Sequence, residues 1–196
     1  MNLPNKLTLL RLFLIPFFLL FMSNPFNMGA IYLLGSEINL SVFIAAIIFI
    51  VASFTDYLDG YIARRDGLVT NFGKFADPLA DKMLVAAAMI MLVEIGKAQG
   101  WVIDVIFARE FAVTGLRLIL VESCGTVLAA AWPGKIKTVT QMLSISFLLL
   151  NDLPFAWTGI PVGTILLYIA LFFTLYSGID YFYNARSFFA GTFGKN

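Results

Sequence analysis

The sequence has no histidine, a single cysteine and few charged residues, which make up 13% of the chain. The absence of histidine removes imidazole as a general base and as a zinc ligand, so carboxylates must carry any acid, base or metal chemistry. Cys124 has no second cysteine with which to form a disulfide and is interpreted as a small apolar filler. The net charge of +1 gives no electrostatic reason to expect nucleic acid as a partner.

Apolar residues are abundant instead. They make up 60% of the 196 residues, and the mean hydropathy is +0.89, whereas a soluble domain is about half apolar and about a quarter charged. One globular core would not hide this much apolar material, which predicts that the lipid bilayer is the solvent for much of the chain. An unusually apolar soluble domain is the alternative, and several long charge-poor runs weigh against it.

Six apolar segments are candidates for membrane-spanning helices, each of which needs about 20 residues. The first and fifth are the weakest, because Arg11 interrupts one and Lys137 and Gln141 interrupt the other. The segments cover residues 7–22, 39–63, 79–97, 101–122, 136–151 and 160–185, and the breaks between them contain Asn24-Pro25, Pro78, Gly96 to Gly100, Trp132 to Gly134, and Pro154 to Pro161. We therefore predict an all-α polytopic membrane protein: one domain, residues 1–196, with six transmembrane helices and a cytoplasm-facing polar cavity.

Basic residues predict the orientation of these helices. If successive connections are assigned to alternate sides of the membrane, nearly all basic residues lie on the side of the N-terminus. The opposite side receives only Lys97. The positive-inside rule then places both termini and the connections after the second and fourth segments in the cytoplasm. The basic residues on that side are Lys6, Arg64, Arg65, Lys74, Lys135, Lys137, Arg186 and Lys195. We expect a multi-pass protein of the cell membrane with a cytoplasmic site.

The most informative stretch is SFTDYLDGYIARRDGLVTNFGKFADPLADK, with the pattern D-x2-D-G-x2-A-R-x8-G-x3-D-x3-D. Asp56 and Asp59 are three residues apart, and Asp77 and Asp81 are four apart, so on helices each pair projects from one face. Two such helix ends facing each other would bring four carboxylates together, which cannot all stay ionised unless cations compensate them. Clusters of carboxylates suit hard cations such as Mg²⁺ or Mn²⁺.

Small residues and an arginine accompany the aspartates. Gly60 and Ala63 follow Asp56 on the same helical face, where missing side chains would let a bulky ligand approach the backbone. Arg64 could bind a phosphate with its planar fork, and Gly73 would permit a close approach of the connection to the next helix. Each feature alone has a plain structural reading, as a cap, a helix contact or a topology anchor. Together they indicate a site for a phosphate ester, most plausibly a diphosphate.

The complete pattern from Asp56 to Asp81 resembles the signature of the CDP-alcohol phosphotransferase family, with no position departing from it. The resemblance implies that Asp56, Asp59 and Asp77 ligate a two-metal centre, and that Asp81 contacts metal and acts as the general base. It also implies a CDP-linked donor bound by the N-terminal stretch and by the residues around the aspartates. These donor-binding candidates are Asn5, Thr8, Gly60, Ala63, Arg64, Thr70 and Gly73.

Charged residues in the second half of the sequence bear on the acceptor. Arg109, Glu110 and Arg117 lie within an apolar segment, where charges normally pair or face a polar cavity. Lys135 and Lys137 begin the next segment. An ion pair between Glu110 and an arginine, with the two lysines as topology anchors, is the structural alternative. As a set, Arg109, Arg117, Lys135 and Lys137 could bind an anionic acceptor such as a phosphorylated polyol.

Three further stretches, PNKLTLLRLFLIPFF, ARE-x3-TGLR and GKIKT-x2-Q, resemble family members that join CDP-diacylglycerol and glycerol 3-phosphate. That resemblance implies the products phosphatidylglycerophosphate and CMP, and a homodimer in the bilayer. Serine, inositol phosphate or phosphatidylglycerol are alternative acceptors. A divalent-cation carrier is an alternative of another class, although it leaves the spacing of Gly60, Ala63 and Arg64 unexplained. A scaffold protein would leave the aspartates unexplained.

Overall fold

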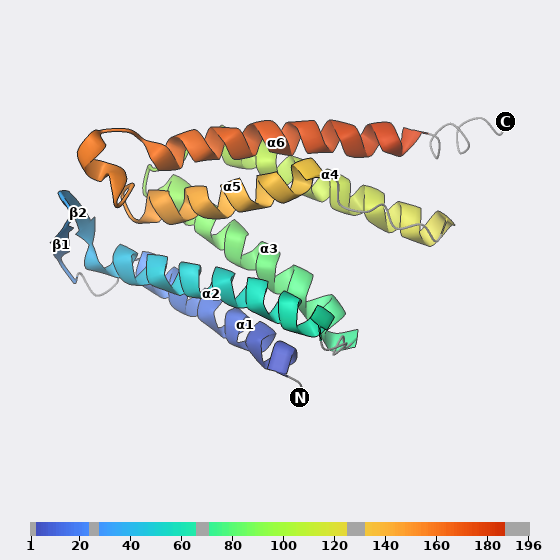
Figure 1. The fold of residues 1–196 in the computed structure, drawn as a ribbon, viewed down its shortest axis with the longest axis horizontal. Coiled ribbons are helices and arrows are strands. Elements are labelled where there is room, and N and C mark those ends of the chain that lie inside the picture. Colours follow the sequence, from blue (N-terminus) through green and yellow to red (C-terminus); the bar gives the residue numbers. More distant parts are fainter. Residues whose placement is uncertain (1–2, 24–27, 66–70, 125–131, 187–196) are drawn as a thin grey trace.

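Six long helices form most of the chain (Figure 1). The computed structural model describes residues 3–23, 28–65, 71–124 and 132–186, with side chains for 5–23, 28–56, 79–120 and 132–186. In order, the elements are α1 (Leu3–Met22), β1 (Ala30–Leu33), β2 (Ser36–Asn39), α2 (Leu40–Arg65), α3 (Asn71–Glu94), α4 (Gly100–Cys124), α5 (Trp132–Leu149), the short 3-10 helix η1 (Phe155–Thr158) and α6 (Val162–Asn184). Each of the six predicted apolar segments corresponds to one long helix.

Two predicted helix starts are wrong, because α3 and α5 begin before the prolines that were expected to precede them. Pro78 lies inside α3, which begins at Asn71. A proline inside a helix removes one backbone hydrogen bond, and here the turns that follow it bury Ala80, Leu84 and Ala88, which supports the helix across that point. Pro133 lies in the first turn of α5, where its missing N–H would have had no partner in the helix.

A short β-hairpin, absent from the all-α prediction, connects α1 to α2. Strands β1 and β2 pair antiparallel with Leu33 opposite Ser36. The two residues between them, Leu34 and Gly35, have φ of 48° and 82°, as a tight hairpin turn of the primed type requires. The Leu-Gly pair is a weak turn signal beside the usual Asn-Gly, and four-residue strands offer little alternation to detect.

The helices form two pairs with a diagonal helix between them (Figure 1). Helix α1 packs on α2, and α5 packs on α6, while α3 contacts α1, α2, α4 and α5. The helix ends that precede or follow the predicted cytoplasmic connections all lie toward the same end of the molecule, at the right of Figure 1. This is the end to which α2 and α3 bring the aspartate motif.

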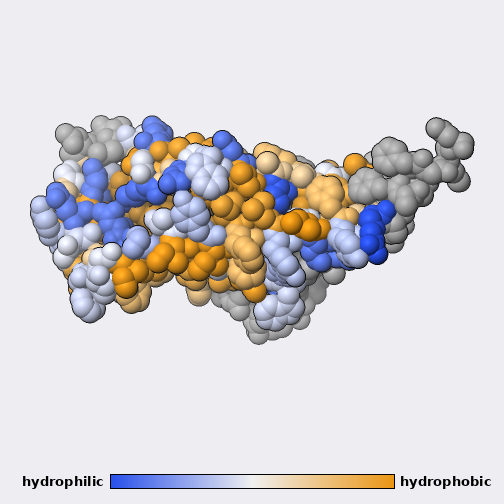
Figure 2. Space-filling model, turned by 90° about the horizontal axis from the view of Figure 1, so that it is seen from above, coloured by the Kyte–Doolittle hydropathy of each residue, from blue (hydrophilic) through white to orange (hydrophobic). Residues whose placement is uncertain are grey.

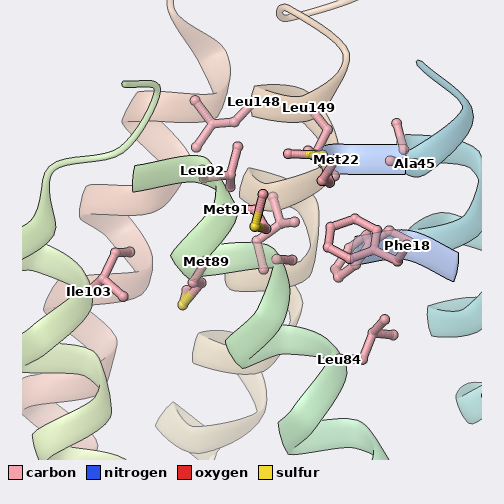
Figure 3. Close-up of a cluster of buried hydrophobic side chains, with 14 of the residues drawn as sticks. Phe18, Met22, Ala45, Leu84, Met89, Met91, Leu92, Ile103, Leu148 and Leu149 are labelled. Carbon is pink, nitrogen blue, oxygen red and sulfur yellow. The ribbon is translucent and has the colours of Figure 1, made fainter. Parts of the chain in front are cut away.

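The main apolar core lies where these helices meet (Figure 3). Phe18 of α1 is fully buried and contacts Phe49 of α2 with ring centroids 6.2 Å apart. Burying a side chain of this size contributes about 1.5–3 kcal/mol. Other large members of this core include Met22, Leu84, Met89, Leu92, Ile106, Ile145, Leu149 and Leu167. The core thus takes side chains from all six long helices and holds them together.

The outer surface is apolar over much of its area. Figure 2 shows apolar side chains across the middle of one face, with hydrophilic side chains toward its ends. Phe13, Phe111 and Ile179 expose 68%, 75% and 71% of their area, which suits contact with lipid. Within the part of the chain that the structure describes, two helical stretches, Asn5–Met22 and Val162–Asn184, are long and apolar enough to cross a membrane. That all six helices do so, and with which orientation, stays a prediction.

Lys97, the one basic residue predicted for the side opposite the aspartates, connects three elements there. Its Nζ donates to the carbonyl of Leu148, at 2.9 Å, and to the side chain of Asn151. Asn151 Nδ2 in turn donates to the carbonyl of Glu37 in β2, at 2.6 Å. These bonds join the α3–α4 turn, the end of α5 and the hairpin.

Candidate active site

The four aspartates all lie on helices, as their spacing predicts. Asp56 and Asp59 lie in α2, and Asp77 and Asp81 lie in α3. The side chains of Asp59 and Asp77 are outside the described part, so only one aspartate of each pair can be examined. The carboxylates of Asp56 and Asp81 are close enough to repel each other electrostatically. Asp56 of α2 and Asp81 of α3 therefore lie near each other, and the convergence of all four aspartates stays a prediction.

Arg11 of α1 supplies a positive charge to this acidic site. Its side chain is fully buried, and Nη1 lies 2.6 Å from Oδ1 of Asp56. It also attracts the carboxylate of Asp81. From the sequence, Arg11 is only an interruption of an apolar segment, although a charge at such a position is itself a signal of a functional site.

The predicted N-terminal donor residues lie on the same helix as Arg11. Asn5, Thr8 and Arg11 follow one another at intervals of three residues and are all buried, so they share the face of α1 that packs against α2 and α3. This brings the N-terminal stretch beside the aspartates. The remaining donor candidates Gly60, Ala63 and Arg64 lie in α2 and Gly73 lies in α3, but their surroundings are not described, and Thr70 is outside the described residues.

The carboxylate oxygens of the aspartate motif are ligands that suit a hard divalent cation. Among residues with described side chains no group of three acidic, histidine or cysteine side chains could hold a metal, because only Asp56 and Asp81 of the motif belong to that part. These two could supply oxygen ligands from two helices, and their carboxylates repel each other, an arrangement that a cation would stabilise. Asp59 and Asp77, on the same helical faces as their partners, would complete the ligand set.

A cavity of about 550 Å³ lies beside the acidic site, between α3, α4, α5 and α6. Its apolar wall includes Phe107, Phe111 and Met142. Its polar lining consists of Asp81, Lys82, Arg109, Glu110, Thr114, Arg117, Lys137, Thr138, Gln141 and Tyr181. Asp81 is the residue common to the acidic site and the cavity.

Four cations and two anions line this cavity, which leaves a net charge of plus two. Glu110 Oε1 is shared by Arg109, whose Nη1 lies 3.3 Å away, and by Lys137. Lys82 donates from Nζ to Thr114 Oγ1 at 2.7 Å. The Nε of Arg109 is buried and has no hydrogen-bond partner among the residues that the structure describes. The positive charge is therefore only partly compensated.

The cavity brings together three of the four residues predicted to bind the acceptor, Arg109, Arg117 and Lys137. Lys135 lies exposed in the first turn of α5 and is not among the lining residues, so its role stays a prediction. The proposed ion pair of Glu110 with an arginine is present, with Lys137 as a second partner.

Three residues that line the cavity have no role predicted from the sequence: Lys82, Gln141 and Tyr181. Lys82 directly follows Asp81 and lies within an apolar segment. A charge in such a segment is the sequence feature that could have indicated a role for Lys82. Tyr181 carries no local signal at all, since it is one of several aromatic residues near the end of α6. Its part in the site follows only from the packing of α6 against α4.

Converging carboxylates beside a cationic cavity, within an apolar helix bundle, are typical of a membrane enzyme that acts on phosphate esters. The chain belongs to the CDP-alcohol phosphatidyltransferase family, which it matches over residues 1–176. This match confirms the family that the motif from Asp56 to Asp81 predicts.

Individual relatives agree with this assignment. The chain is 51% identical over 181 residues to a CDP-diacylglycerol–glycerol-3-phosphate 3-phosphatidyltransferase of Bacillus subtilis, covering 92% of this chain and 93% of the relative. It is 40% identical over 194 residues to a protein of the same name from Rickettsia felis, covering 96% and 97% of the two chains. A protein of that name from Escherichia coli is 37% identical over 191 residues, which cover 95% and 96%.

Proposed function

We propose that the protein transfers the phosphatidyl group of CDP-diacylglycerol to glycerol 3-phosphate, forming phosphatidylglycerophosphate and CMP in phospholipid biosynthesis. The names of its relatives support this reaction. The structural observation that carries it is the position of Asp81, which interacts with Asp56 and also lines the cationic cavity. A base at that position would lie between a metal-bound donor and an anionic acceptor.

The donor half of the site would be the acidic motif with the buried face of α1. The family is generally dependent on a divalent metal, and Asp56, Asp59, Asp77 and Asp81 would hold two Mg²⁺ or Mn²⁺ ions. When bound, these ions neutralise the diphosphate and stabilise CMP as it leaves. Around the nucleotide and the diphosphate we propose contacts from Asn5, Thr8, Gly60, Ala63, Arg64, Thr70 and Gly73.

The acceptor half would be the cavity. A phosphate monoester carries a charge of about −1.5 to −2 near pH 7, which matches the net charge of the lining side chains. Arg109, Arg117 and Lys137 would bind the phosphate, and Lys82 adds a fourth positive charge. The buried Nε of Arg109, without a partner among the described residues, is a donor that the phosphate could satisfy. Lys135 could contact the phosphate at the entrance.

The proton of the attacking hydroxyl would pass to Asp81. The acceptor oxygen forms a bond to the phosphorus that bears diacylglycerol, the bond to CMP breaks, and CMP leaves with the electron pair. Asp81 can serve as the base if its carboxylate lies within hydrogen-bond distance of that hydroxyl. Because the carboxylate lines the cavity, the hydroxyl can reach it from the acceptor side.

We further propose that all six helices span the bilayer, that both termini and the site face the cytoplasm, and that the protein is a homodimer. In Figure 1 the helix ends next to the predicted cytoplasmic connections lie toward the same end of the molecule. This supports successive helices that cross the membrane in opposite directions. Residues 1–196 would form one domain, because α3 and α5 contact each other and each of the other four long helices contacts α3 or α5.

A panel of acceptors tests the function. Purified protein with CDP-diacylglycerol and Mg²⁺ should release CMP with glycerol 3-phosphate, and much more slowly with serine, inositol phosphate or phosphatidylglycerol. The net positive charge of the cavity favours a phosphorylated acceptor over serine. Release of CMP with serine and not with glycerol 3-phosphate would show that the acceptor is wrong. Metal flux into vesicles without lipid turnover would support the carrier alternative.

A further inference from the structure

The two cavity arginines of α4 meet one aromatic ring of α6. The guanidinium carbon of Arg117 lies 4.9 Å from the centroid of the Tyr181 ring, and that of Arg109 lies 5.9 Å from it. The two guanidinium groups repel each other electrostatically. A ring face within about 6 Å attracts a cation, so Tyr181 offsets part of that repulsion and keeps both groups on its surface.

Hydrogen bonds to α6 orient the same two side chains. Arg117 Nη2 donates to the Tyr181 hydroxyl, and Arg109 Nη2 donates to Ser177 Oγ at 2.8 Å. Ser177 and Tyr181 are four residues apart and both buried, so they present one face of α6 to α4. Each arginine is thus bonded to a different side chain of that face.

Gly178 allows the close approach between the two helices. A Cβ at this position would lie 3.1 Å from Cγ and 3.7 Å from Nε of Arg109. The first distance is shorter than ordinary van der Waals contact, so a side chain here would push the arginine stem away from α6. Ser177, Gly178 and Tyr181 together therefore constrain where the Arg109 guanidinium can lie.

We propose that Ser177, Gly178 and Tyr181 are positioning residues that hold Arg109 and Arg117 ready for the phosphate of the acceptor. Free arginine side chains lose rotamer entropy when they are fixed, and a site that holds them in advance avoids that cost during binding. The inference rests on the proposed function, since it names the residues that give the cavity its preference for a phosphate monoester.

The kinetics of single variants test the inference. Ser177→Ala removes the acceptor of the Arg109 hydrogen bond, and Tyr181→Phe removes the acceptor of the Arg117 bond while keeping the ring. We expect each to raise KM for glycerol 3-phosphate about fivefold to tenfold, which is less than the full contribution of a hydrogen bond to a charged group, because the arginine itself stays in the cavity. Tyr181→Leu, which also removes the ring, should raise it further. KM for CDP-diacylglycerol should stay within about twofold in every variant, because the donor contacts are unchanged.

Tyr183→Phe is the matched control. Tyr183 lies on the same helix, and its ring also faces an arginine, Arg186, whose guanidinium carbon is 4.0 Å from the centroid. It is exposed and outside the cavity lining. This variant should keep both KM values of the wild type.

A double variant separates positioning from a general loss of structure. If Ser177 acts through Arg109, Ser177→Ala should change kcat/KM for glycerol 3-phosphate by less than about twofold in an Arg109→Met background. An equal effect of Ser177→Ala in both backgrounds, equal rises in both KM values, or unchanged acceptor KM would each overturn the inference. These outcomes differ from failure of the proposed function, which would appear as a wild-type protein that releases no CMP with glycerol 3-phosphate.

Discussion

Replacing Arg11 with methionine isolates the charge balance of the acidic site. The Arg11 side chain is fully buried, and its Nη1 lies 2.6 Å from Asp56, whose side chain is 35% exposed. Removing one partner of a buried ion pair costs about 3–5 kcal/mol, because the other charge stays buried without compensation. Since Asp56 keeps some access to solvent, we expect the lower end of that range, about 3 kcal/mol.

The measurement is thermal unfolding of the purified protein in detergent. For a chain of this length 1 kcal/mol corresponds to about 2–4 °C, so Arg11→Met should lower Tm by roughly 6–12 °C without added metal. Added Mg²⁺ should restore part of the loss, because a divalent cation also compensates Asp56. Arg186→Met, which removes an exposed arginine, should shift Tm by less than about 2 °C.

The double variant Arg11→Met with Asp56→Asn gives the decisive comparison. Replacing both members of a buried ion pair with neutral groups of similar shape is often nearly neutral for stability. The double variant should therefore unfold close to the wild-type temperature, although it has lost a proposed metal ligand and should be inactive. A double variant as unstable as Arg11→Met, or an Arg11→Met protein as stable as wild type, would refute the reasoning.

Three further predictions use separate parts of the structure. Asp81→Asn should abolish CMP release while leaving Tm and elution volume near those of wild type, and turnover at the wild-type rate would exclude Asp81 as the base. Lys137→Met should raise KM for glycerol 3-phosphate by about 10-fold or more, on the scale of a hydrogen bond to a charged group. Lys135→Met should raise it less, because only Lys137 lines the cavity. Equal effects of the two variants on KM would contradict the geometry. Gly163→Ala should destabilise the protein by about 1–3 kcal/mol, because the new Cβ would lie 2.9 Å from the Leu148 backbone nitrogen. Gly115→Ala, with nothing within 4 Å of its Cβ, is the matched control and should unfold no lower than wild type.

Local regularity explains which parts of the fold were predictable. The six helices follow from apolar runs of suitable length, and the positions of Asp56 and Asp81 on helix faces follow from spacings of three and four residues. The predicted starts of α3 and α5 were wrong because both rested on prolines. Pro78 lies inside α3, where packing of the following turns offsets its cost, and Pro133 lies in the first turn of α5, where proline is well tolerated. The hairpin at Leu34-Gly35 was missed because its strands are too short to show a period.

What the sequence determined by itself was the family, the helices and the acidic motif, since each depends on residues close together along the chain. The tertiary structure decided which distant residues meet: Arg11 with Asp56, Glu110 with Lys137, and Arg117 with Tyr181. Spacing along the chain carries no information about such pairs, because they arise from the packing of one helix against another. The charge of the cavity is therefore a property of the packed bundle, assembled from side chains of α3, α4 and α5.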